Sequence, residues 1–104
     1  MSGAGEAPGQ PAAAPVLSRT VTIPNLRGLH ARAAAKFVAM AERFGAAVEV
    51  LKDGQSVSAR SIMGLMMLGA GQGSAIELRA EGWDAKEALD ALAALVESGF
   101  NEHE

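Results

Sequence analysis

The stretch "NLRGLHARAAAKF", from Asn25 to Phe37, marks the transition from a loop to an alanine-rich helix and decides how the rest of the chain is read. Gly28 permits an unusual backbone turn just before the helix, because glycine adopts conformations that are closed to other residues. His30, one of two histidines in the chain, stands at the predicted helix start. It therefore either carries out chemistry or caps the helix.

The residues before this stretch predict a strand over 18–25. Val21 and Ile23 point to one side of it, and the threonines between them point to the other. Pro24 ends the strand because it has no N–H to donate to a neighbouring strand.

The residues after His30 predict a helix from Ala31 to Phe44, with Gly45 in the position of a C-terminal capping glycine. One apolar stripe at helical spacing supports the helix. Its members are Ala34, Phe37, Val38, Ala41 and Phe44.

Residues 46–60 predict a β-hairpin, because two runs of β-prone residues flank Asp53 and Gly54, a pair suited to a type I′ turn. Ser61 then stands where the N-cap of a short helix is expected, and Gly69 closes the apolar segment "IMGLMMLG".

Residues 74–82 alternate between apolar and polar side chains, which predicts a half-buried strand after a loop at 70–73. Asp84 and Glu87 then resemble a capping box at the start of a last helix that runs to about Ser98. The resulting order is β-α-β-β-α-β-α. It predicts an α+β open-faced sandwich, a four-stranded antiparallel sheet covered on one face by three helices.

Composition divides the 104 residues into one folded domain and two short ends. Residues 1–17 are rich in Ala, Gly and Pro, a composition that buries too little apolar surface to order itself, so we expect a disordered leader. The folded domain is expected at 18–100 and a polar, frayed tail at 101–104.

Charge and residue usage exclude several classes of function. The formal charge is −3, with one Trp and no Tyr, which gives no support to nucleic-acid binding. No apolar run approaches the ~20 residues that span a membrane. The chain has no cysteine, which fits a reducing cytoplasm.

Two features near His30 predict an anion site. The first N–H groups of a helix lack partners within it, and the helix dipole places partial positive charge there, which favours phosphate. Arg32 adds a planar cation suited to phosphate oxygens. These surroundings favour a neutral imidazole that can attack and hold a phosphoryl group. Taken alone, the same residues also fit a capping or surface histidine, whereas a metal site has almost no support because no second histidine is at hand.

Ser61 and the segment after it also have two interpretations each. Ser61 is a structural N-cap, yet a phosphoserine there would be favoured by the helix dipole. The following segment holds too many apolar residues for one face of a short helix, so either some stay exposed for partners or the helix is fully buried. These residues are Ile62, Met63, Leu65, Met66, Met67 and Leu68.

Together these motifs resemble the histidine-containing phosphocarrier protein (HPr) family of the bacterial phosphotransferase system. That family carries a Gly-[Leu/Ile/Met]-His-Ala-Arg segment at the start of its first helix, here Gly28 to Arg32. It also has a regulatory serine that opens its second helix before an Ile-Met-Gly-type run, here from Ser61. The spacing and the element order match as well. The "HARAA" segment further resembles proteobacterial relatives of the nitrogen-related branch.

The resemblance implies roles for particular residues. His30 would be phosphorylated on Nδ1 by enzyme I, whose donor is phosphoenolpyruvate, and Arg32 would stabilise the phosphate. Ser61 would be the target of HPr kinase/phosphorylase. The apolar patch where partners dock would comprise Ile62, Met63 and Met66. No cofactor is implied, and the partners are proteins.

One position departs from the family pattern. Many members have proline after the arginine, whereas this chain has Ala33. A first-turn proline helps to fix helix geometry but donates nothing to phosphate, so the site is expected to survive the change.

The predicted function is a cytoplasmic carrier that takes a phosphoryl group from enzyme I on His30 and passes it to an EIIA-type protein. Such a carrier is a stoichiometric relay without turnover of a small substrate of its own. Two alternatives stay open. One is a regulatory protein controlled mainly through Ser61. The other is a small phosphatase, which needs a second catalytic group near His30.

Overall fold

The computed structural model of the protein describes residues 15–102. Its elements are β1 (Leu17–Thr22), α1 (Ala31–Ala41), β2 (Ala47–Lys52), β3 (Gln55–Ser58), α2 (Ile62–Met67), β4 (Ala75–Glu81), α3 (Ala85–Glu97) and a short 3-10 turn, η2 (Gly99–Asn101). The predicted order of strands and helices is confirmed. Most of the predicted leader lies outside the described residues, and β1 begins at Leu17, the last residue assigned to that leader.

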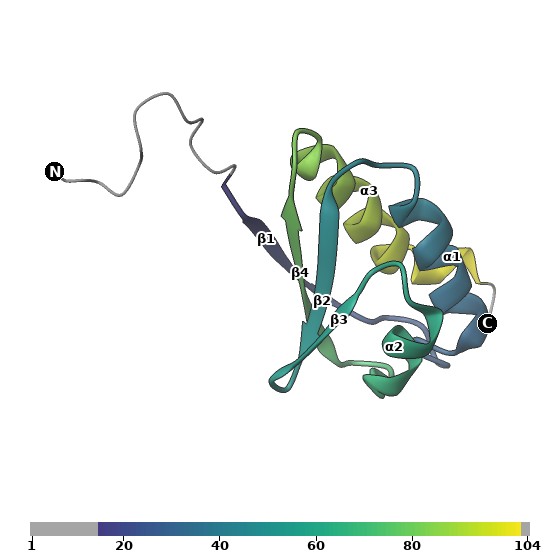
Figure 1. The fold of residues 1–104 in the computed structure, drawn as a ribbon. Coiled ribbons are helices and arrows are strands. Elements are labelled where there is room, and N and C mark those ends of the chain that lie inside the picture. Colours follow the sequence, from purple (N-terminus) through teal and green to yellow (C-terminus); the bar gives the residue numbers. More distant parts are fainter. Residues whose placement is uncertain (1–14, 103–104) are drawn as a thin grey trace, which may run out of the picture.

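The four strands form one sheet in the order β1-β4-β2-β3, and each neighbouring pair is antiparallel. All three helices lie on one face of this sheet (Figure 1). The structure therefore confirms the predicted open-faced α+β sandwich. Among residues 15–102, no helix is long and apolar enough to cross a membrane.

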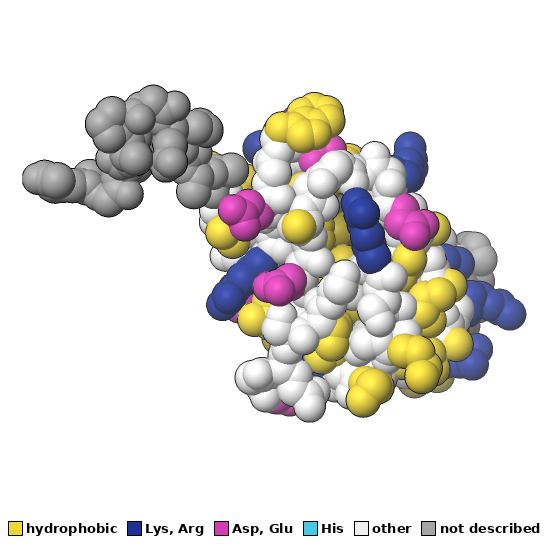
Figure 2. All heavy atoms as spheres, viewed as in Figure 1, with side chains coloured by type: hydrophobic (Ala, Val, Ile, Leu, Met, Phe, Trp, Pro, Cys, Tyr) yellow, Lys and Arg dark blue, Asp and Glu magenta, His cyan; other side chains and the backbone are white. Residues whose placement is uncertain are grey.

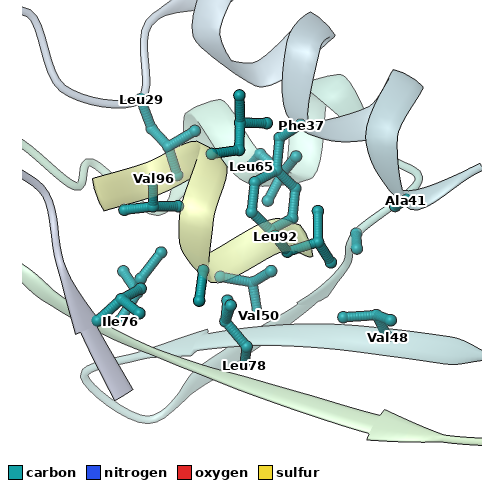
Figure 3. Packing of buried hydrophobic residues seen from close by; sticks show 14 of the residues in the cluster. Leu29, Phe37, Ala41, Val48, Val50, Leu65, Ile76, Leu78, Leu92 and Val96 are labelled. Atoms are coloured by element: carbon teal, nitrogen blue, oxygen red, sulfur yellow. The ribbon is translucent and has the colours of Figure 1, made fainter. Parts of the chain in front are cut away.

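The core lies between the sheet and the three helices. Ile76 and Leu78 point inward from β4, as the alternation predicts, and both are buried. Phe37 of α1, Leu65 of α2 and Leu92 of α3 meet them from the helical layer (Figure 3). Burial of these apolar side chains is the main force that holds the helices on the sheet.

The predicted turns are present. Asp53 and Gly54 both have positive φ, 51° and 81°, as a type I′ hairpin requires. The Oγ of Ser61 accepts a hydrogen bond from the Gly64 N–H (2.9 Å), so Ser61 caps α2. Gly69 has a φ of 64° just after that helix, which is the backbone of a C-terminal glycine.

The end of α1 differs from the prediction. The helix stops at Ala41 instead of Phe44, and the Phe44 N–H donates to the Ala41 carbonyl (3.2 Å) in a tighter turn. Gly45 does not cap the helix, because its φ is not positive. A side chain at this position would instead meet the indole of Trp83. The close approach of Trp83 explains why residue 45 is a glycine.

Asp84 precedes α3 but does not cap it. Its side chain makes no hydrogen bond to the first turn of the helix, so the predicted capping box with Glu87 is wrong. The carboxylate instead accepts hydrogen bonds from the N–H groups of Gly45 (2.9 Å) and Ala46 (2.8 Å) in the loop between α1 and β2. Asp84 is buried and joins two segments that are distant in sequence.

The substitution Asp84→Ala is expected to lower the free energy of unfolding by about 2 kcal/mol, because it leaves two buried or half-buried N–H donors without their partner. Urea denaturation measures the loss. Asp90→Ala is the matched control, since Asp90 pairs with Arg19 and Lys86 on the surface, where ion pairs contribute little. Equal losses in the two variants would contradict a structural role for the buried carboxylate.

Candidate functional site

The loop that leads into α1 is held against the loop that follows α2. Gly28 has a φ of 65°, and a side chain there would overlap the carbonyl group of Ala70. The Leu29 N–H donates to the same carbonyl (2.9 Å), and the Leu29 side chain is buried. These contacts set the position of His30, and they place the start of α1 beside the end of α2.

His30 is the N-cap residue of α1, but its side chain does not cap the helix. Its backbone is extended (φ −75°, ψ 179°), and its carbonyl accepts the first helical bond from the Ala34 N–H (2.8 Å). Its imidazole makes no capping hydrogen bond, and the first turn of α1 holds no acidic residue. The capping interpretation is therefore wrong. His30 directly precedes the first turn of α1, whose leading N–H groups have no partner within the helix.

The imidazole of His30 pairs with a carboxylate from the other end of the chain. Its Nε2 lies in hydrogen-bond contact with Oε2 of Glu102. The side chain of Asn25 donates to the second oxygen of Glu102 (3.1 Å) and to the carbonyl of Gly28 (3.0 Å). Glu102 falls in the part of the chain that was predicted to be a frayed tail. Its side chain is instead only 12% exposed.

The turn η2 positions Glu102 next to His30. Gly99, Phe100 and Asn101 all have positive φ, between 58° and 68°, which folds the chain back after α3. Phe100 is fully buried, and its carbonyl accepts a hydrogen bond from Nζ of Lys36 (2.7 Å). Positive φ is unfavourable for a bulky residue, so burial of the phenyl ring must offset the strain.

Burial by itself would raise the pKa of Glu102, but hydrogen bonds from His30 and Asn25 and the positive charge of Lys36 lower it. These interactions prevail and hold the pKa of Glu102 below its ordinary value of 4.5. Glu102 is therefore ionised at neutral pH. Since an ionised carboxylate can only accept hydrogen bonds, Nε2 of His30 must supply the hydrogen.

The His30–Glu102 contact is expected to persist at pH 4.5 and to be lost as the pH falls further. Because the pKa of Glu102 is depressed in the folded state, its contribution is complete above the unfolded value and disappears as the pH falls through the lower folded value. An NMR titration of the Glu102 carboxyl carbon measures the midpoint. Asn25→Ala should move this midpoint upward, and a wild-type midpoint at or above 4.5 would contradict the expectation.

Arg32 extends from the first turn of α1 and is exposed. Among residues 15–102, no carboxylate forms an ion pair with it. Within this part of the chain, its guanidinium is therefore available to an anion at the helix start. The described residues contain no cluster of three or more His, Cys, Asp or Glu side chains that could hold a metal ion.

The apolar residues of α2 divide between core and surface. Leu65 is fully buried, whereas Met63 is 73% exposed and the helix leaves three further apolar side chains at the surface. The exposed set, named the α2 patch here, is Ile62, Met63, Met66 and Met67. Figure 2 shows hydrophobic side chains gathered at the lower right of the molecule, where Figure 1 places α2. The interpretation of α2 as a fully buried helix is wrong. Met67, which had not been assigned to the docking surface, belongs to the patch.

Three residues of the site escaped the sequence analysis: Asn25, Lys36 and Glu102. Each belongs to the site through a contact with a residue distant in sequence, and none stands in a motif. One local signal could have indicated them: Phe100 is an apolar residue after the last predicted helix, and it is buried in the core.

Comparison with known proteins agrees with this geometry. The family model described as "PTS HPr component phosphorylation site" matches residues 17–98. The phosphocarrier protein HPr of Cupriavidus necator is 48% identical over 89 residues, which cover 86% of this chain and all of the relative. The phosphocarrier protein NPr of Shewanella violacea is 46% identical over 86 residues, which cover 83% of this chain and 94% of the relative.

A solved structure shares the fold. The crystal structure of HPr-C-His from Thermoanaerobacter tengcongensis superposes with a TM-score of 0.81 at 48% identity, and the match covers 85% of this chain and 99% of that one. The match of the family model, the near-complete coverage of the relatives and the shared fold agree. The chain therefore belongs to the HPr family of phosphocarrier proteins of the phosphotransferase system.

Proposed function

We propose that this protein accepts a phosphoryl group on His30 from enzyme I of the phosphotransferase system and passes it to an EIIA-type protein. The carrier domain, expected at 18–100, also includes Leu17 at the start of β1 and Glu102 beside His30, and the protein works in the cytoplasm. The observation that carries the proposal is the placement of His30. Its imidazole stands at the N-terminus of α1, is not used as a cap, and is joined through Nε2 to a carboxylate.

Among residues 15–102, the His30 imidazole is hydrogen-bonded through Nε2, which leaves Nδ1 for the chemistry. The lone pair of Nδ1 attacks phosphorus, an N–P bond forms, and the bond between phosphorus and the donor breaks with its electron pair leaving on the donor. The N–H groups of the first turn of α1 and the guanidinium of Arg32 stabilise the phosphoryl oxygens. Passing the group to the acceptor reverses these steps.

Protein partners must reach His30 in turn, so the site needs an adjacent docking surface. The α2 patch lies beside the start of α1 because the loops preceding α1 and following α2 are bonded to each other. Exposed methionines adapt to more than one partner surface. We therefore assign contact with enzyme I and with the EIIA-type protein to the α2 patch and Arg32.

The test is phosphoryl transfer from radiolabelled phosphoenolpyruvate through enzyme I. The label on the protein should be lost in acid, as expected for phosphohistidine, and should move to an added EIIA-type protein. Acceptors of the sugar-transport and nitrogen-related branches, compared side by side, identify the branch. A protein that stays unlabelled with its cognate enzyme I would overturn the proposal.

A second candidate function is regulation through Ser61 by HPr kinase/phosphorylase. The observation that favours it is the position of the Ser61 hydroxyl at the N-terminus of α2, next to the exposed patch. A phosphoryl group there would add negative charge where the helix end favours it and where partners dock. The kinase should place an acid-stable label on the wild type and on His30→Ala but not on Ser61→Ala. If the wild type and both variants stay unlabelled, regulation through Ser61 is contradicted.

A further inference from the structure

We infer that Glu102 is a positioning residue for His30: its carboxylate holds the hydrogen on Nε2 and so leaves the lone pair of Nδ1 free to accept the phosphoryl group. The inference rests on the carrier function proposed above. It assigns a role in the transfer to the residue that follows the turn η2, which no motif near His30 indicates.

The contact is shielded from water on both sides. The side chain of His30 is 14% exposed and that of Glu102 is 12% exposed. A charge-assisted hydrogen bond is stronger in such surroundings than on an open surface, where water competes for both groups.

Glu102 is itself held in place from two directions. Asn25 donates to its free oxygen (3.1 Å) and is fixed in turn by a bond to the Gly28 carbonyl. The chain just before Glu102 is anchored by buried Phe100, whose carbonyl accepts from Lys36 of α1 (2.7 Å). A surface carboxylate that met His30 by chance would have neither anchor.

The pairing has a chemical consequence for both nitrogens. A neutral imidazole carries one N–H and one lone pair, and the partner of one nitrogen decides which is which. With Nε2–H donated to Glu102, the lone pair lies on Nδ1. When Nδ1 forms its bond to phosphorus and the donor departs with its electron pair, the ring becomes cationic. The hydrogen on Nε2 does not move, and the negative charge of Glu102 stabilises that ring.

The first measurement needs no phosphoryl transfer. In an NMR spectrum of the full-length, nitrogen-labelled protein at neutral pH, the Nε2–H of His30 should give an observable, slowly exchanging signal. Glu102→Ala should abolish that signal, and Glu102→Gln should retain it because an amide oxygen still accepts. Glu97→Ala is the matched control, since Glu97 is an exposed carboxylate near the end of α3.

The second measurement follows phosphorylation by enzyme I with the protein as substrate. Glu102→Ala should lower kcat about tenfold, by analogy with metal-bound histidines, whose loss of a hydrogen-bonded carboxylate partner costs about 10–100-fold. The KM for the carrier should change little, because Glu102 lies outside the α2 patch. Glu102→Gln should recover part of kcat, and Glu97→Ala should match the wild type.

The two measurements separate this inference from the function on which it rests. An unlabelled wild type would overturn the carrier function, while the NMR signal still decides whether Glu102 holds Nε2–H. If Glu102→Ala keeps the Nε2–H signal, or loses it but is phosphorylated at the wild-type kcat, the positioning role is overturned.

Discussion

The substitution His30→Ala is expected to abolish acid-labile phosphorylation by enzyme I, a loss larger than any other change to the site would cause. The reason is chemical, because alanine offers no nucleophile and the neighbouring donors cannot replace one. The measurement is incorporation of label from phosphoenolpyruvate, followed by acid treatment. Since the imidazole does not cap α1, the variant should keep its fold, which circular dichroism and urea denaturation check.

The other histidine provides the control for this experiment. His103→Ala should be labelled as well as the wild type, because the resemblance to the family places the acceptor at His30 alone. Persistent acid-labile label on His30→Ala together with its absence from His103→Ala would move the acceptor to the C-terminus. That result would contradict the proposed site.

The largest expected effect on stability comes from Phe37→Ala. Phe37 is fully buried beneath α1, where it meets side chains of α2 and α3 (Figure 3). Removing a buried phenyl ring costs about 3–5 kcal/mol through lost burial and the cavity left behind. Small domains are stable by only about 5–15 kcal/mol, so the variant should be close to unfolding. The midpoint and slope of urea denaturation measure the change.

Met63→Ala is the control for that loss, because Met63 is also a large apolar residue on a helix but is 73% exposed. Its free energy of unfolding should change by less than about 0.5 kcal/mol. If the two substitutions destabilise the protein equally, the division of apolar residues between the core and the α2 patch is wrong.

Local patterns predicted most of the fold. Alternation in residues 75–81 identified β4 and its inward face, because the period of a strand is set by the backbone alone. Asp53 and Gly54 identified the hairpin, because few residues tolerate positive φ at both positions. Ser61 identified the start of α2 through a hydrogen bond to a residue three positions later.

Two of the errors, those at Gly45 and Asp84, share one cause. Gly45 was assigned to the end of α1 and Asp84 to the start of α3, since both residue types are common at those positions. In the structure they meet each other, with the carboxylate of Asp84 accepting from the Gly45 N–H and the indole of Trp83 filling the space beside the glycine. In both cases a tertiary contact, and not a helix cap, accounts for the residue.

The sequence by itself determined which residues of the site carry chemistry in the proposed mechanism. His30, Arg32 and Ser61 stand in short motifs whose spacing places them at helix starts, and helix starts depend on contacts within a few residues. Only the tertiary structure decided how His30 is held. Its partner Glu102 lies 72 positions away and is delivered by the strained turn η2, buried Phe100 and the hydrogen bond from Lys36. No sequence period encodes such a contact, because it exists only when α1 and the end of α3 pack on the same sheet.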